Sequence, residues 1–234
     1  MNTNIITNFL KLKTSLFFLP LFLLIIIVLF LYNRDALSVN EYIQIQKDSF
    51  FSINHCLGQY PILQLNLTQF GDGLIFLSFL SIFILYAPKL WESLTAGLLI
   101  SLLFSSVLKK AFAVPRPAAV FDNNSFIITG KKLAGLNSLP SGHSITVFTV
   151  LTVLLFAFMP HRLKYKIIWF LLVVITGLIL AFTRVGVGAH YPIDVITGCI
   201  IGYISGLLGI FISREYKICG WVNDKKYYPL FIVL

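Results

Sequence analysis

A histidine and a carboxylate are spaced in this sequence so that they could form a nucleophilic pair. Asp194 follows His190 by four residues, and Pro192 between them suits the first position of a helix, so that both side chains are expected on one face. A carboxylate that accepts the N–H of one imidazole nitrogen fixes the tautomer and leaves the other nitrogen free to attack. Taken alone, the pair is equally compatible with a structural hydrogen bond or with part of a metal site.

A second motif, Pro140-Ser141-Gly142-His143, has the features of a helix start that binds an anion. Ser141 is a favourable N-cap residue, and Gly142 lets a ligand approach the backbone. The free amides of a first helical turn attract anions, and His143 lies in that turn. Taken alone, the motif is also compatible with a capped helix that carries an interfacial histidine.

Three cationic side chains accompany these motifs. Lys109 and Arg184 end apolar runs, and two prolines that flank Arg116 force its backbone to be extended. Three cations suit an anion with several oxygens, and arginine adds a planar, bidentate fork. Ordinary snorkelling at a helix end explains the neighbouring Lys110, and it is an equal alternative for Lys109 and Arg116 taken by themselves.

The elements that must position these groups are membrane-spanning helices. The chain has 234 residues, of which 58% are hydrophobic and 12% charged, and its mean hydropathy is +0.89. Soluble domains are about 45–50% apolar and about 25% charged, so a soluble domain is excluded. A span needs about 20 apolar residues, which leaves room for about six.

We therefore expect an all-α, polytopic membrane protein that forms a single domain over residues 1–234. Residues 33–70 are too weakly apolar to span and are expected to lie in the interface as a loop with short amphipathic helices. The six predicted transmembrane helices lie at about 15–32, 71–87, 93–108, 141–159, 167–182 and 194–212.

The distribution of Lys and Arg predicts the orientation. With a cytoplasmic N-terminus, ten of the 18 Lys and Arg residues fall in short cytoplasmic segments, among them Lys217, Lys225 and Lys226. The other eight are spread over long outer loops, and three of those eight are the cations described above. Both termini are therefore expected to be cytoplasmic, with the candidate site at the outer ends of the helices.

Composition also limits the partners. The net charge of +9 indicates anionic lipid or a phosphorylated substrate. No basic stripe with stacking aromatic residues indicates nucleic acid. The outer carboxylates lack metal-ligand spacing, and a two-metal phosphatase needs several of them, so no metal is expected.

The three motifs together closely resemble the signature of the type 2 phosphatidic acid phosphatase superfamily. That signature is a Lys, six residues and Arg-Pro; then Pro-Ser-Gly-His; then Ser-Arg, five residues, His, three residues and Asp. The chain contains all three parts in order and register. Thr183 stands where the family usually has Ser, and it keeps the hydroxyl.

The resemblance implies a metal-independent phosphoric monoester hydrolase that needs no cofactor. It implies that His190 is the nucleophile and forms a phosphohistidine, that Asp194 orients it, and that His143 is the general acid. The residues that it implies for binding the phosphoryl oxygens are Lys109, Arg116, Arg184, Ser141 and Gly142.

The expected substrate is the phosphate of a lipid headgroup at the periplasmic face of a bacterial inner membrane. The chain is similar to bacterial lipid A 1-phosphatases and undecaprenyl diphosphate phosphatases, so lipid A is ranked first and undecaprenyl diphosphate second. Phosphatidylglycerophosphate, phosphatidic acid and phosphoryl transfer to another lipid stay open, as does the oligomeric state. An anion transporter is the other alternative. It is remote because a permeation path needs polar groups near the midplane, whereas the charges here gather on one face and the span centres are apolar.

Overall fold

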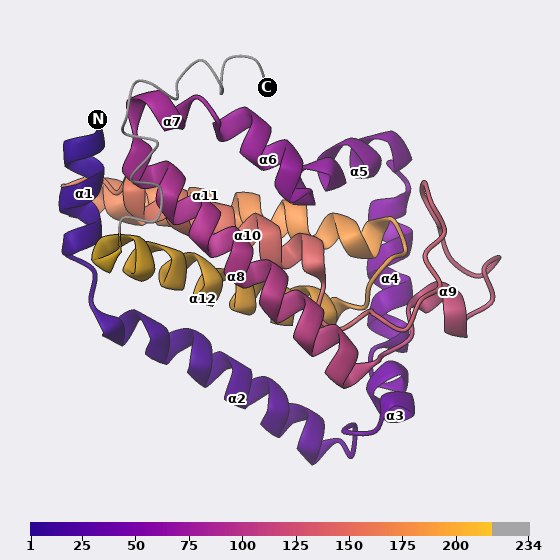
Figure 1. Ribbon diagram of the computed structural model, residues 1–234. Helices are drawn as coiled ribbons and strands as arrows, with labels where there is room; N and C mark the ends of the chain where they lie inside the picture. Colours follow the sequence, from indigo (N-terminus) through magenta and orange to yellow (C-terminus); the bar gives the residue numbers. More distant parts are fainter. Residues whose placement is uncertain (217–234) are drawn as a thin grey trace.

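The computed structural model describes residues 1–216, and all regular structure within them is helical (Figure 1). The helices are α1 (Asn2–Leu10), η1 (Thr14–Phe17), α2 (Phe18–Asn33), α3 (Val39–Gln44), α4 (Lys47–Gly58), α5 (Pro61–Thr68), η2 (Gln69–Gly71), α6 (Gly73–Leu80), α7 (Phe83–Tyr86), α8 (Pro88–Phe112), α9 (Pro117–Val120), α10 (Gly142–Ala157), α11 (Leu163–Gly186) and α12 (Pro192–Glu215).

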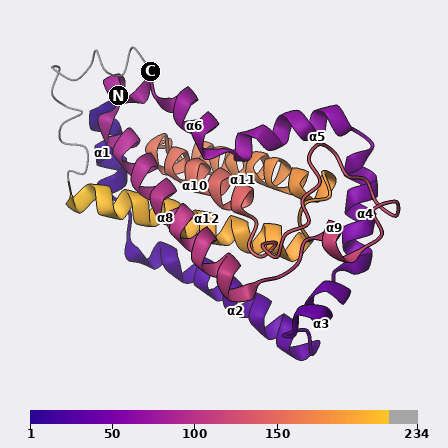
Figure 2. The same cartoon turned by 45° about the vertical axis from the view of Figure 1, so that its right-hand side comes forward.

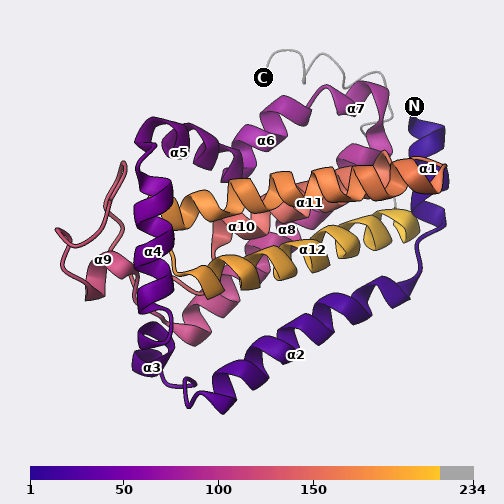
Figure 3. The same ribbon diagram turned by 180° about the vertical axis from the view of Figure 1, so that it is seen from behind.

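Helices α8, α10, α11 and α12 form the central bundle, with α10 and α12 side by side within it (Figures 1 and 3). Glycines in α12 let the two helices approach closely. A Cβ atom on Gly198 would lie 2.7 Å from the carbonyl oxygen of Ser141, and one on Gly202 would overlap the backbone of Ile145. This glycine stripe therefore brings the first turn of α12 against the start of α10.

Four helical stretches are long and apolar enough to cross a membrane, so the protein is a multi-pass membrane protein. They coincide with the predicted first, third, fifth and sixth spans. The four stretches are Thr14–Asn33, Pro88–Val120, Leu163–Gly186 and Pro192–Glu215. The terminal lysines used for the orientation (217, 225 and 226) lie outside the described residues.

The other two predicted spans, the second and the fourth, differ from these four. Helix α10, in the predicted fourth span, has 16 residues and is shorter than the other candidates. The predicted second span, 71–87, forms two short helices, α6 and α7, instead of one. At the break, the hydroxyl of Ser81 donates to the carbonyl oxygen of Ser78 (2.7 Å), a local bond that competes with regular helix.

The segment from α3 to α5 runs across one end of the bundle, as Figure 2 shows. The sequence predicted short helices here, and α4 packs against α11. Its Phe50 is fully buried, with its ring centroid 5.6 Å from that of Tyr191 and 5.3 Å from that of Phe126. These helices therefore cover the end of the bundle where α12 begins.

Candidate active site

The three sequence motifs meet at this covered end of the bundle. Helix α8 ends at Phe112 because Ala113 adopts a left-handed conformation (φ 47°), which an L-residue rarely takes inside a helix. The chain then reaches Arg116 in extended conformation, as the flanking prolines predicted. The starts of α10 and α12 and the end of α11 supply the remaining site residues.

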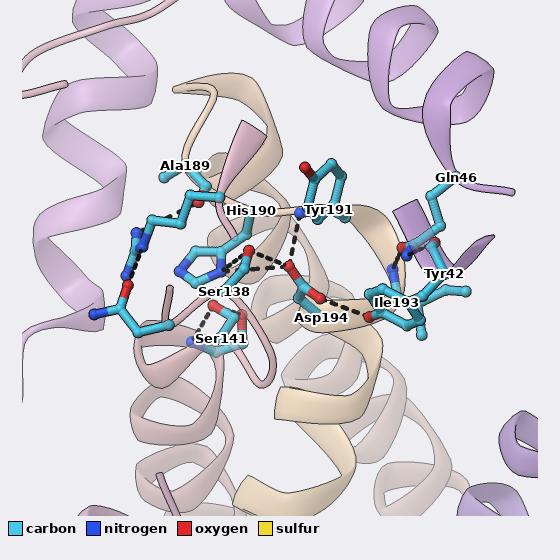
Figure 4. Close-up of polar contacts among 12 residues, drawn as sticks. Tyr42, Gln46, Ser138, Ser141, Ala189, His190, Tyr191, Ile193 and Asp194 are labelled. Carbon is cyan, nitrogen blue, oxygen red and sulfur yellow. Dashed lines mark hydrogen bonds and ion pairs between the residues drawn. The ribbon is translucent and has the colours of Figure 1, made fainter. Parts of the chain in front are cut away.

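His190 and Asp194 lie together, both fully buried. The Nδ1 atom of His190 is 3.6 Å from Oδ2 of Asp194, and the other ring nitrogen points away from the carboxylate (Figure 4). Helix α12 begins at Pro192, so His190 precedes the helix and does not share a helical face with Asp194. The carboxylate instead bends back and accepts the N–H of Tyr191 (2.9 Å).

Two hydroxyl groups complete the surroundings of Asp194, and the sequence motifs did not reveal either. Ser138 donates to Oδ2 and Tyr42 donates to Oδ1, each at 2.6 Å (Figure 4). The Ser138 hydroxyl is also 3.5 Å from Nδ1 of His190. Ser138 lies two residues before the Pro-Ser-Gly-His motif, which is a local signal, whereas Tyr42 is 152 residues from its partner.

The two arginines are buried and held by neutral acceptors. The Nε atom of Arg116 donates to Oδ1 of Asn137 (2.7 Å), and its Nη1 donates to the carbonyl oxygen of Ala189 (3.4 Å). Nη1 of Arg184 donates to the hydroxyl of Thr68 (2.8 Å), and its Nε has no hydrogen-bond partner among residues 1–216. Both guanidinium groups thus keep donors that an anion can use.

The start of α10 lies beside the third cation. Ser141 is the N-cap, as predicted, and its hydroxyl accepts from the N–H (3.4 Å) and the hydroxyl (2.8 Å) of Ser144. A Cβ atom on Gly142 would lie 3.1 Å from Nζ of Lys109, so a larger residue here would press on the ammonium group. The absence of a side chain at Gly142 therefore leaves room beside the Lys109 ammonium group.

His143 occupies the first turn of α10, where it packs closely against Gly71. A Cβ atom at that glycine would lie 2.6 Å from Cβ of His143. His143 and Arg184 line one pocket of about 200 Å³, and Thr68 and Lys131 also line it. The predicted proton donor and one predicted phosphate ligand therefore face the same space.

The electrostatic surroundings keep His190 neutral. Burial lowers its pKa well below the usual value, and the positive charges of Arg116, Arg184 and Lys109 lower it further. A neutral imidazole with one nitrogen beside a carboxylate has a free lone pair on the other nitrogen. Among the described residues, no three His, Cys, Asp or Glu side chains are grouped as a metal site requires. The arrangement can hold an oxyanion beside a neutral nucleophile.

Comparisons with known proteins find relatives that carry two different names. The chain is 32% identical to a lipid A 1-phosphatase of Rhizobium etli over 152 residues, which are 62% of each protein. It is 26% identical to an undecaprenyl-diphosphatase of Sulfolobus acidocaldarius over 158 residues, 67% of this chain and 72% of that protein. The matched region spans about three fifths of the length of the curated lipid A 1-phosphatase.

A solved structure and a family profile extend the similarity. The crystal structure of Aquifex aeolicus LpxE superposes with a TM-score of 0.57 at 27% identity, covering 74% of this chain and 96% of that one. The profile of the PAP2 superfamily matches residues 90–217, more than half of the chain, and these residues contain all three motifs. The chain therefore belongs to the PAP2 superfamily.

Proposed function

We propose that this protein is a metal-independent membrane phosphatase that removes a phosphate from a lipid headgroup through a phosphohistidine at His190. One observation carries the proposal: a neutral, buried histidine lies beside a carboxylate and near cations that pair with no carboxylate within residues 1–216. A dianionic phosphoryl group supplies the missing charge. The same cations then stabilise the charge that develops in the transition state.

The proposed reaction has two steps. In the first, the free ring nitrogen of His190 attacks phosphorus, and the bond from phosphorus to the lipid oxygen breaks while His143 protonates that oxygen. In the second, water attacks the phosphohistidine, His143 takes its proton, and the phosphorus–nitrogen bond breaks to release inorganic phosphate. Asp194 stabilises the imidazolium character of His190 during attack.

Lipid A with a 1-phosphate is the substrate that we rank first. The relatives named lipid A 1-phosphatase and the LpxE structure support this choice. Lys131, from the loop between the first two motifs, lines the pocket beside His143 and suits a large polar headgroup. Asn137 from the same loop instead binds Arg116, so it serves the site and not the headgroup.

Undecaprenyl diphosphate is the second candidate, because one relative carries that name and is matched over more of its length. Both lipids present a phosphate at the membrane surface, so the site chemistry does not distinguish them. In either case we propose a bacterial inner membrane, cytoplasmic termini and a periplasmic site. Six transmembrane segments, with α6–α7 and α10 completing the four longer ones, belong to the same proposal.

Phosphate release in detergent micelles tests the proposal. Purified protein is given lipid A or undecaprenyl diphosphate with EDTA present, alongside His190→Ala, His143→Ala and, as a matched control, His161→Ala, whose side chain is exposed. Loss of the nucleophile should reduce turnover by at least ~10⁴-fold. His161→Ala should match the wild type, and His143→Ala should still bind inorganic phosphate.

The outcomes separate the alternatives. Metal-independent release that requires His190 supports the phosphohistidine route, and the faster lipid identifies the substrate. Near-normal turnover in both His190→Ala and His143→Ala would contradict the assignment of roles. A folded wild-type protein that releases phosphate from neither lipid would favour another phosphate donor or the transporter alternative.

A further inference from the structure

Tyr42 reaches the centre of the site from an unexpected part of the chain. It lies on α3, which begins after Ser38, whose hydroxyl accepts the N–H of Glu41 (3.3 Å). Its side chain is 4% exposed, and its hydroxyl is the only described partner of Oδ1 of Asp194. The PAP2 match covers residues 90–217, so the contact comes from outside the family motifs.

A second contact ties the same segment to α12. Gln46 is buried, and its Nε2 donates to the carbonyl oxygen of Tyr42 (2.8 Å). Its Oε1 accepts the N–H of Ile193 (2.8 Å), one of the amides that have no partner inside α12 (Figure 4). Tyr42 and Gln46 therefore hold the side chain and the backbone of the first turn that carries Asp194.

We propose that Tyr42 is a positioning residue of the phosphatase reaction, which fixes the Asp194 carboxylate in the orientation that selects the reactive tautomer of His190. The inference rests on the proposed function and deepens it. Tyr42 touches no reacting atom, and it acts only through Asp194. Gln46 supports it by joining α3 to the start of α12.

The chemistry of the contact supports this role. Burial, together with the adjoining Asp194 carboxylate, raises the pKa of Tyr42 well above its usual value, so the hydroxyl remains a donor. Oδ2 of Asp194 already accepts from Ser138 and from the N–H of Tyr191. Without the Tyr42 hydroxyl, Oδ1 is buried without a hydrogen-bond donor. Rotation of the carboxylate away from His190 then becomes energetically favourable.

Tyr42→Phe is the decisive variant, because it removes the hydroxyl and keeps the ring. The ring lines an apolar cavity of about 540 Å³ between α2, α8 and α12. Phenylalanine keeps that ring, so the packing of the side chain is preserved. The matched control is Tyr203→Phe, which makes the same change on α12 where the ring packs against Phe156 (centroids 6.3 Å apart). Both variants are compared with the wild type for turnover of lipid A and undecaprenyl diphosphate in micelles.

Tyr42→Phe should lower kcat by about 10- to 100-fold, which is the worth of one hydrogen bond to a buried charge. KM and the inhibition constant of inorganic phosphate should stay within about twofold, because the cations are untouched. Tyr203→Phe should behave as the wild type. A merely structural role would instead lower the melting temperature and the fraction of protein that binds phosphate.

Nitrogen-15 NMR of histidine-labelled protein gives a readout that does not need turnover. The His190 signal, assigned by its loss in His190→Ala, should report the Nδ1–H tautomer in the wild type and in Tyr203→Phe. In Tyr42→Phe it should report a mixture of both tautomers. An unchanged kcat and an unchanged His190 spectrum in Tyr42→Phe would overturn the inference. An inactive wild type would contradict the proposed function, and the spectra would still decide the role of Tyr42.

Discussion

The two ends of the helical bundle both bury charged groups, but only one end balances them. At the end opposite the site, Glu92 is 3% exposed and pairs with Lys89 on the same helix (2.9 Å). The Lys89 ammonium group also donates to the carbonyl oxygen of Ser213 on α12, and the hydroxyls of Ser93 and Ser213 are 2.6 Å apart. There the Lys89 cation meets the Glu92 anion, and the ammonium group finds a further partner in the Ser213 carbonyl group.

At the site end, Arg116 and Arg184 are buried with the carboxylate of Asp194, and the Lys109 ammonium group lies beside the start of α10. Among the described residues, none of the three cations pairs with a carboxylate, and the donors to Asp194 are hydroxyls and an amide. Burying unpaired charge is costly, so the fold tolerates here what it avoids at the other end. The difference teaches that an unbalanced charge cluster, and not burial of charge as such, favours the binding of an anion.

Within this comparison of the two ends, the largest effect is expected from removing one of the unbalanced cations. Arg184→Leu should lower kcat/KM by about 10²- to 10³-fold, the usual loss when one group that stabilises transition-state charge is removed. Its thermal midpoint should stay the same or rise, because a buried cation beside two others is gone. Phosphate-release kinetics and thermal unfolding in the same detergent measure both. A variant that is less stable and equally active would contradict the comparison.

The balanced end should respond in the opposite way. Lys89→Met leaves Glu92 buried without its partner and should lower the free energy of unfolding by about 3 kcal/mol, with kcat per folded molecule unchanged. Unfolding in a denaturing detergent measures the loss. The double variant Lys89→Met/Glu92→Gln should recover most of it, because no charge is left unpaired. Equal losses in the single and double variants would show that the pair itself is not responsible.

The local geometry around the candidate site residues could be predicted from sequence. Ser141 caps α10 and Pro192 begins α12 because these residue types favour such positions whatever surrounds them. Arg116 leaves α8 in extended conformation because prolines on both sides allow little else. The spacing of the motifs then placed the functional side chains at one end of the bundle.

The supporting part could not be predicted, because it depends on contacts between distant residues. Nothing local distinguishes Tyr42 from the other tyrosines, and its partner is 152 residues away. The segment 33–70 was expected in the interface because its polar residues are mixed with aromatic ones. That pattern does not indicate which of these side chains pack against the bundle: Asn54 is buried, and its amide group donates to the carbonyl oxygens of Val185 and Gly186 (2.9 and 3.2 Å).

The smallest expected effect concerns the proton on His190, and it sharpens the comparison. The pKa of His190 lies well below its usual value near 6.5, first because of burial and then because of Arg116, Arg184 and Lys109. The unfolded chain therefore binds a proton below about pH 6.5 that the folded chain does not, so stability falls as the pH drops below that value. Above it, this residue adds no dependence of stability on pH.

Nitrogen-15 NMR of His190 between pH 8 and pH 5 measures this balance directly. The signal of the wild type should remain that of a neutral ring as the pH passes 6.5. In Arg184→Leu the pH at which the His190 ring becomes protonated should be higher than in the wild type, because one repelling charge is gone while the burial remains. Inorganic phosphate should shift it in the same direction, since it neutralises Lys109, Arg116 and Arg184, which pair with no carboxylate among residues 1–216. If neither change moved the transition, burial alone would keep His190 neutral, and the unbalanced cations would serve only to bind the phosphate.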